Sequence, residues 1–434
     1  MDLSSVNPVM VATLAGALLT ALCVCGCRGS APPVLKKPTI AVHYDTEYEH
    51  TIVNNEHKPA MLEGIWDQYV ETLDEPVSVT EWNETASQWR VLFATNRGAV
   101  SATSAGFDPE GGFGNQVTAS VSHGTATVQL PHRHRGQDPA QKPRFKLASL
   151  TGQDPEEEQP LASVIDVAKL PAEDFRRQLR QQIDASRQHD VLLFVHGFNV
   201  DFESSLIRAA QLGLDIPFNG ALVAYSWPTQ GGVLNYSDDE PINTASVQPF
   251  VQFLREVVDT LPEDARLKIV VHSMGNRIVL QALNHLSRPE GSRRPIHTLC
   301  LCAPDVGRTD FELWVPGVVE RCDRVIMYVN DGDTALLASK SLHAEQRSGD
   351  AAPYVTAAGV EVIDCSGIDL SLMGHSYFSG NASVLADLFA VLKEEKTPAE
   401  RYWLKRESLS GSDGEVWTFA EHPPQILWTW HFDP

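Results

Sequence analysis

Three residues that together can activate a hydroxyl group lie in the second half of the chain, in the order Ser273, Asp333 and His375. Each follows an apolar run of the kind that forms a buried strand. A serine hydroxyl is a weak nucleophile at neutral pH, so it needs a base and an acid that orients this base. The residue types and their order predict nucleophilic catalysis, with Ser273 as nucleophile, His375 as base and Asp333 as the orienting acid.

The residues around Ser273 predict the turn that such a nucleophile needs. An apolar run from Leu267 leads into Ser273, and residues 277–286 have helical spacing of apolar side chains. Strand, sharp turn and helix form a nucleophile elbow, which exposes the serine and aims the N–H of the next residue, Met274, at an oxyanion. Gly275 supplies the second glycine of the pattern Gly-x-Ser-x-Gly, whereas Val271 stands in place of the first. Taken alone, Ser273 also suits a helix N-cap.

A second apolar run, 192–195, ends in His196-Gly197. In hydrolases built around an elbow, a strand end of this kind supplies the other N–H of the oxyanion hole, which we assign to Phe198. A His-Gly pair by itself is often only a turn. Two suitable strand ends in the right order make a chance agreement much less plausible.

The acid and the base have alternatives. Asp331 lies in the same loop as Asp333, and Asp305 follows the preceding apolar run, from which a carboxylate can also reach the histidine. Asp305 also suits an N-cap of the helix that follows it. For His375 the alternative is a loop histidine with its hydrogen bonds satisfied.

The elements that must position these residues have the pattern of an α/β protein. Short apolar runs at 191–195, 221–226, 267–271, 297–303, 323–329 and 360–364 alternate with helical patterns. This alternation predicts a mainly parallel sheet with helices on both faces and with its chemistry at the carboxyl ends of the strands. The runs 90–97 and 116–130 predict antiparallel strands at the N-terminal edge.

Six short motifs together resemble a family of bacterial α/β-hydrolases long catalogued as a domain of unknown function and described as esterase- or lipase-like. They are His-Gly-Phe-Asn199, Ser-Trp-Pro228, His-Ser-Met-Gly-Asn276, Ala-Pro-Asp305, Asp333-Thr-Ala-Leu and Gly-His375-Ser-Tyr. Phe-Ala-Thr-Asn-Arg97 and the strand pattern at 123–131 are also similar to this family. The resemblance covers roughly residues 90–395 and implies the α/β-hydrolase fold, while it says little about the substrate.

The first residues have the pattern of an export signal. No charged side chain lies between Asp2 and Arg28, and the apolar run ends in Gly26-Cys27. This ending resembles a bacterial lipobox, so we expect residues 1–27 to be a lipoprotein signal with lipidation at Cys27. Because no basic residue precedes the run, an uncleaved anchor and a cleaved soluble form are the alternatives. All three place the protein in the cell envelope or outside the cell.

The rest of the chain divides into four parts. Residues 28–38 are typical of an extended tether, and residues 39–90 form an N-terminal region with no assigned role. We expect the α/β-hydrolase domain at 91–396. Residues 397–434 hold four of the nine tryptophans and predict a small aromatic β-rich appendage.

Composition excludes several classes of function. The 434 residues carry a net charge of −22, which repels phosphate backbones, so we expect no nucleic-acid partner. Seven cysteines are too few, and their spacing is unsuitable, for a disulfide framework or a zinc site, and Cys300 and Cys302 are best explained as buried apolar residues. His132 and His134 have no acidic or cysteine partner nearby in the sequence. We therefore expect no metal and no cofactor.

The sequence thus predicts an exported serine hydrolase that acts on a small carboxylic ester through an acyl-enzyme. An acyltransferase with the same triad and a non-catalytic envelope protein that uses the fold for interaction are the alternatives. The connection 303–323 is too short for a large lid, so we expect the loop 228–246 to form a wall of the substrate pocket.

Overall fold

The protein is described by a computed structural model. The structure describes residues 39–45, 76–83, 86–100, 112–131, 162–231, 235–287, 291–351, 353–366, 368, 381–407, 414–419 and 425–431. His375, His132, His134, Cys27 and the tether 28–38 lie outside these residues.

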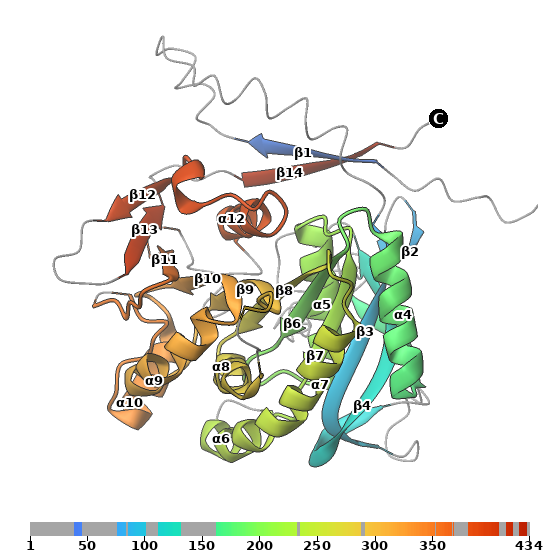
Figure 1. Cartoon of the computed structure of the whole chain (residues 1–434), viewed down its shortest axis with the longest axis horizontal. Helices are drawn as coiled ribbons and strands as arrows, with labels where there is room; N and C mark the ends of the chain where they lie inside the picture. Colours follow the sequence, from blue (N-terminus) through green and yellow to red (C-terminus); the bar gives the residue numbers. More distant parts are fainter. Residues whose placement is uncertain are drawn as a thin grey trace, which may run out of the picture. The chain divides into compact units, whose positions relative to one another are not determined.

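A mixed sheet forms the centre of the described chain (Figure 1). Its parallel middle runs in the order β7 (Ala221–Ser226), β6 (Asp190–Val195), β8 (Arg266–His272), β9 (Ile296–Cys302), β10 (Cys322–Val329) and β11 (Val360–Asp364). The predicted apolar runs agree with these bounds to within about one residue. The reason is that strands buried on both faces are apolar at nearly every position. The mainly parallel α/β fold is confirmed.

The order in which successive strands are added to the sheet reverses at β6. β7 follows β6 and lies on one side of it, whereas β8, the next strand in sequence, lies on the other side. Such a reversal opens a crevice at the carboxyl ends of the strands, which is where open α/β sheets bind ligands. His196 and Ser273 are at the carboxyl ends of β6 and β8, so the fold brings them to this edge of the sheet.

Antiparallel strands form the N-terminal edge of the sheet, as the sequence predicts. β3 (Ala86–Ala99) joins β7 in parallel and pairs antiparallel with the long β4 (Phe113–Pro131). β4 pairs in turn with β5 (Ser163–Leu170), and β2 (Val79–Trp82) pairs with β3. The described part of the N-terminal region 39–90 therefore belongs largely to the sheet.

Two apolar cores cover the two faces of the sheet. Successive side chains of a strand point to opposite faces, so Leu192 and Phe194 belong to one core and Val191 and Leu193 to the other. The first core is closed by α5 (Phe202–Asp215) and α12 (Ala382–Leu392). The second is closed by α4 (Ala172–Ala185), α7 (Val247–Thr260), α8 (Gly275–His285) and α9 (Arg308–Val319). No described helix has the length and apolarity needed to cross a membrane.

Two short helices follow parallel strands at their carboxyl ends. α6 (Tyr236–Ala245) lies within the expected wall segment 228–246, and α10 (Thr334–His343) follows β10. The short connection after β9 holds only α9. The cysteines of β9, Cys300 and Cys302, are fully buried free thiols, and burial raises the pKa of both.

The C-terminal segment extends the sheet and also pairs with the first described strand. β13 (Glu415–Phe419) lies parallel to β11 and antiparallel to β12 (Leu404–Glu407), which follows the short 3-10 helix Pro398–Glu400. β14 (Gln425–His431) pairs with β1 (Thr39–Asp45) in a separate antiparallel sheet (Figure 1). The β-rich part of 397–434 is thus built into two sheets.

Asp387, on α12, ties this segment to the domain. Its carboxylate accepts hydrogen bonds from Tyr328 of β10 (2.8 Å), from Trp403 (2.7 Å) and from the guanidinium of Arg401 (2.5 Å). Asp387 and Arg401 are both fully buried. A buried charge without its partner is costly, so this cluster makes the C-terminal segment part of the cooperative fold.

We expect Asp387→Asn to lower the free energy of unfolding by about 3 kcal/mol, because the buried Arg401 loses the nearer of its two countercharges and keeps only Glu361, 3.3 Å away. Denaturant unfolding of the purified protein measures this change. Asp323→Asn is the control, since Asp323 is an exposed aspartate on β10. Equal stability of the two variants would contradict the role given to Asp387.

Candidate active site

Ser273 lies in the turn between β8 and α8. Its φ angle is +51°, in the left-handed region that residues with a side chain rarely adopt. Its N–H donates to the Cys302 carbonyl (2.9 Å), and its own carbonyl accepts from the Asn276 N–H (3.0 Å). Such a conformation costs about 1–3 kcal/mol and is found mostly at functional sites. Strand, strained turn and helix therefore have the geometry of a nucleophile elbow.

Two glycines let the ends of β6 and β8 approach each other. A Cβ at Gly275 would lie 2.4 Å from the His196 carbonyl oxygen, and one at Gly197 would lie 2.7 Å from the Ser273 Cβ. Either position therefore excludes a side chain. Val271, in place of the usual first glycine, is fully buried in the apolar core under α8, which explains why a β-branched residue is accepted there.

Phe198 and Met274 place their N–H groups next to Gly197 and Ser273. Among the described residues, neither N–H donates a hydrogen bond to the protein. α6 contacts both residues. The centroids of the Tyr236 and Phe198 rings lie 5.4 Å apart, and the Asn243 amide donates to the Met274 carbonyl (3.0 Å). Two N–H groups are thus free for a ligand oxygen, with α6 as the adjoining wall.

The two aspartates of the loop after β10 differ in environment. Asp333 is 2% exposed, and its Oδ1 accepts from the Leu336 N–H (3.1 Å) in the first turn of α10. Asp331 is exposed, and its backbone N–H donates to Ser366. A carboxylate that orients a catalytic histidine is usually buried, and Asp333 meets this condition.

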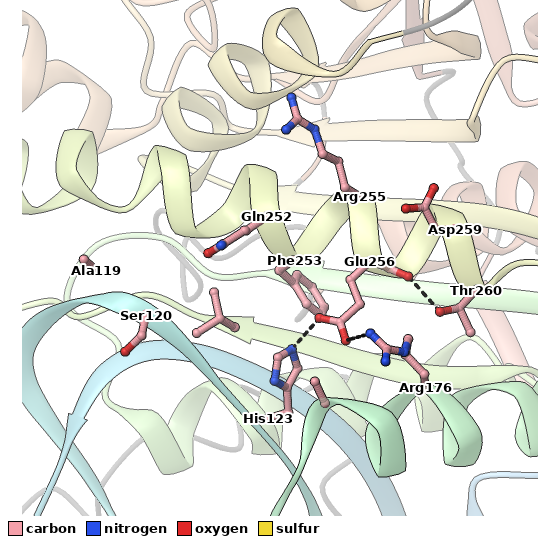
Figure 2. Close-up of a pocket in the computed structure, with 12 residues that line it drawn as sticks. Ala119, Ser120, His123, Arg176, Gln252, Phe253, Arg255, Glu256, Asp259 and Thr260 are labelled. Atoms are coloured by element: carbon pink, nitrogen blue, oxygen red, sulfur yellow. Dashed lines mark hydrogen bonds and ion pairs between the residues drawn. The ribbon is translucent and has the colours of Figure 1, made fainter.

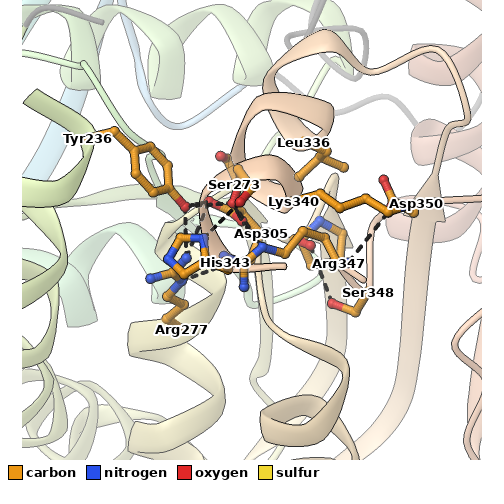
Figure 3. A network of polar contacts seen from close by, with 12 residues as sticks. Tyr236, Ser273, Arg277, Asp305, Leu336, Lys340, His343, Arg347, Ser348 and Asp350 are labelled. Atoms are coloured by element: carbon orange, nitrogen blue, oxygen red, sulfur yellow. Dashed lines mark hydrogen bonds and ion pairs between the residues drawn. The ribbon is translucent and has the colours of Figure 1, made fainter. Parts of the chain in front are cut away.

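Asp305 is the centre of a polar network beside Ser273 (Figure 3). Its Oδ1 accepts from Ser339 (2.7 Å) and forms an ion pair with Arg347, whose Nε lies 3.2 Å away and donates to Ser339 Oγ (2.8 Å). Its Oδ2 accepts from the Tyr236 hydroxyl and lies 3.6 Å from the Arg277 guanidinium. Asp305 does not cap the next helix, because α9 begins at Arg308 with Gly307 as N-cap.

Charge explains why Asp305 stays ionised although it is buried. Burial raises the pKa of this carboxyl, but the positive charges of Arg277 and Arg347 outweigh burial and hold the pKa below its ordinary value. Burial and the Asp305 charge together raise the pKa of Tyr236 far above its usual range, so its hydroxyl keeps its proton and donates. Both carboxylate oxygens of Asp305 thus have a hydrogen-bond partner within the network.

Glu240 fastens the middle of α6 to its neighbours. Its carboxylate accepts from Arg277 of α8 (2.6 Å) and from the Nε2 of His343 on α10 (2.7 Å). These contacts hold the pKa of Glu240 below its ordinary value against the effect of burial. The segment expected to form the pocket wall is therefore a helix tied to α8 and α10.

Sequence reasoning did not assign site roles to Arg277, Ser339 or Arg347. They lie far from Asp305 in the chain, and only contacts in the folded state join them to it. Only Arg277 could have been found from the sequence, since it lies in the first turn of the helix that follows the elbow. His375, the expected base, lies outside the described residues. The described residues contain no group of three metal-binding side chains.

A groove elsewhere in the domain shares no lining residue with this site, and Figure 2 shows the residues that line it. It is an open groove of about 930 Å³ between β4, α4 and α7. Within it the Glu256 carboxylate lies 2.8 Å from His123 and 3.2 Å from Arg176, and burial lowers the pKa of His123. None of its lining residues comes from the strand ends that carry Ser273 and Phe198.

The elbow, the facing glycine and the order of the strands agree with the sequence family that the chain matches. Residues 171–392, slightly more than half of the chain, match the family described as "Alpha/beta hydrolase of unknown function (DUF900)". The chain belongs to this family. No curated protein matches the chain significantly.

Three solved structures are similar to this α/β-hydrolase at low sequence identity. A putative thioesterase from Silicibacter sp. is 15% identical, with 51% of this chain and 89% of that chain covered and a TM-score of 0.27. Esterase B from a Lactobacillus is 12% identical (49% and 78% covered, TM-score 0.28). Phospholipase PlaB from Legionella pneumophila is 16% identical (55% and 51% covered, TM-score 0.20).

The close packing at the elbow predicts the effect of one added methyl group. Gly275→Ala places a Cβ against the His196 carbonyl, so the two strand ends must separate, and we expect a loss of about 1–3 kcal/mol in stability. Ser273 should also lose reactivity toward a fluorophosphonate, because the N–H groups beside it move.

Gly114→Ala is the control, since its Cβ would meet the Val100 side chain at an ordinary 3.4 Å. Thermal unfolding and the rate of labelling measure the two effects. Wild-type behaviour of Gly275→Ala in both would show that the strand ends are not in this close contact.

Proposed function

We propose that this α/β-hydrolase is an exported serine hydrolase of small carboxylic esters. The observation that carries the proposal is the left-handed backbone of Ser273 at the end of β8, packed against Gly197 at the end of β6. This arrangement costs free energy and is found mostly at functional sites. It supports the proposal because a nucleophile elbow places the serine hydroxyl beside the N–H of the next residue.

The mechanism follows from the roles of these groups. Ser273 Oγ attacks the ester carbonyl while His375 accepts its proton, and the N–H groups of Phe198 and Met274 stabilise the oxyanion. His375 then protonates the leaving alcohol, and the acyl-enzyme remains. Water, activated by the same histidine, releases the acid and restores Ser273.

Asp333 is the acid that we propose for orienting His375. It is buried, and it lies in the loop after β10, within the part of the fold where hydrolases of this type place the acid. Asp305 is less suitable because each of its carboxylate oxygens already accepts a hydrogen bond, from a tyrosine or a serine, and lies beside an arginine. Exposure argues against Asp331, since water competes for its carboxylate.

Labelling by a fluorophosphonate tests the nucleophile. We expect one covalent adduct, at Ser273, because only a serine beside a base and an oxyanion hole reacts quickly with this reagent. Intact mass and peptide mapping locate the adduct, and Ser273→Ala and His375→Ala should abolish it. Hydrolysis of 4-nitrophenyl butyrate should disappear in the same variants. A folded wild type that neither reacts nor hydrolyses esters would favour a non-catalytic role, and acyl transfer to an added alcohol would indicate a transferase.

A comparison of three aspartates tests the acid. Asp333→Asn should lower kcat by about 10³- to 10⁴-fold, because the amide favours the wrong tautomer of the histidine. Asp331→Asn should change kcat little. Asp305→Asn should mainly lower the melting temperature, because the buried Arg347 loses the carboxylate beside it and Arg277 keeps only Glu240 as a countercharge. If Asp305→Asn loses activity at unchanged stability and Asp333→Asn keeps it, the assignment is wrong.

Export remains a proposal that rests on the sequence pattern up to Cys27. In a bacterial host, the full chain should fractionate with membranes and carry the mass of a diacylglyceryl group. Cys27→Ser should abolish the lipid adduct, while Cys25→Ser, two residues earlier, should not. Unchanged membrane association without any lipid adduct would instead indicate an uncleaved helix.

A further inference from the structure

The Gly197–Phe198 peptide, which carries the Phe198 N–H, rests on a buried histidine. His196 is fully buried, and its Nδ1 lies 2.8 Å from the Gly197 carbonyl oxygen. A carbonyl can only accept, so Nδ1 carries a hydrogen and donates it. Trp227 holds the ring in place: the two rings are parallel within 4°, and the Trp227 Nε1 donates to the His196 carbonyl (2.8 Å).

The other nitrogen of this ring faces a hydroxyl. His196 Nε2 lies 3.4 Å from Ser226 Oγ at the end of β7. Burial, and in addition the charge of Arg97, lowers the pKa of His196 far below its ordinary value, so the ring is neutral and Nε2 has no hydrogen. Ser226 Oγ therefore donates to Nε2, and it accepts from the Arg97 Nε at 2.9 Å.

Arg97, the first donor in this series of hydrogen bonds, is a buried arginine. The side chain is 1% exposed, and its direct partners among the described residues are neutral: Ser226 Oγ, the Val200 carbonyl (2.7 Å), the Asn115 amide oxygen (3.2 Å) and the Gly114 carbonyl. Burial lowers the pKa of Arg97 to about 10, against the opposing charges of Asp201 and Asp239. At neutral pH the arginine therefore keeps a positive charge behind the Gly197–Phe198 loop.

We propose that Arg97 and Ser226 are positioning residues of the oxyanion hole. Hydrogen bonds run in one direction, from Arg97 to Ser226, to His196 and to the Gly197 carbonyl. In a trans peptide the C=O and the next N–H point in opposite directions, so fixing the Gly197 carbonyl also fixes the Phe198 N–H. Hydrogen bonds in a chain polarise one another, and the charge at its end strengthens the donor at the other. The role as an oxyanion donor rests on the proposed function.

Ser226→Ala removes the hydroxyl that links Arg97 to His196, and it leaves the hydrogen bond from Arg97 to the Val200 carbonyl intact. With 4-nitrophenyl butyrate we expect kcat to fall about five- to tenfold and KM to stay unchanged, because the oxyanion exists only in the transition state. Thr229→Val is the matched control. Thr229 is equally buried and donates to the same Val200 carbonyl (3.1 Å), but it lies outside the chain. Ser226→Thr keeps the hydroxyl and should restore much of kcat.

Nuclear magnetic resonance supplies a readout that does not depend on turnover. Ser226→Ala should shift the ¹⁵N signal of His196 Nε2 and the amide signal of Phe198, and Thr229→Val should move neither by a similar amount. If Ser226→Ala leaves these signals unmoved, the series of hydrogen bonds itself is overturned. Equal losses of kcat in Ser226→Ala and Thr229→Val, or a change in KM alone, would overturn its role in the oxyanion hole. If the wild type is inactive and unlabelled but Ser226→Ala still shifts these signals, the proposed function is overturned and the series of hydrogen bonds is established.

Discussion

The contact between the ends of β6 and β8 is the constraint on which the rest of the site depends. Gly197 and Gly275 allow two backbones to approach so closely that neither position has room for a Cβ. Ser273 accepts a left-handed backbone as part of the same contact. Because the two strands are neighbours at the point where strand order reverses, their loops meet at the same edge of the sheet. The Phe198 and Met274 N–H groups therefore come from separate loops and still lie near one serine.

Buried charge holds the surroundings of this contact in place. Asp305 joins α6, α8 and the segment after α10 through a tyrosine, a serine and two arginines. Arg97 in turn joins β3 to the loop after β6 and to the end of β7. Each network consists of groups that would be costly to leave unpaired, so each favours one arrangement of the loops over others. A site made of loops gains in this way some of the rigidity of the sheet.

The ends of the described chain are also tied to the domain. β1 pairs with β14, while β12 and β13 extend the sheet beside β11. The region 39–90 and the segment 397–434 had no assigned role in the sequence, and their described parts complete sheets. If the chain is anchored at Cys27, only the short tether 28–38 separates that anchor from β1.

The sequence alone determined the fold class, the bounds of the parallel strands and the position of the elbow. These features are local: a strand buried on both faces is apolar at nearly every position, and an elbow is a few consecutive residues between a strand and a helix. Only the tertiary structure separated Asp305 from Asp333 by their surroundings, and only it revealed Arg97 behind His196. Ser226 lies 129 residues from Arg97, and Arg347 lies far along the chain from Asp305. Hydrogen bonds and ion pairs between such distant residues leave no periodic pattern in the sequence, because they depend on which strand ends and helices the fold brings together.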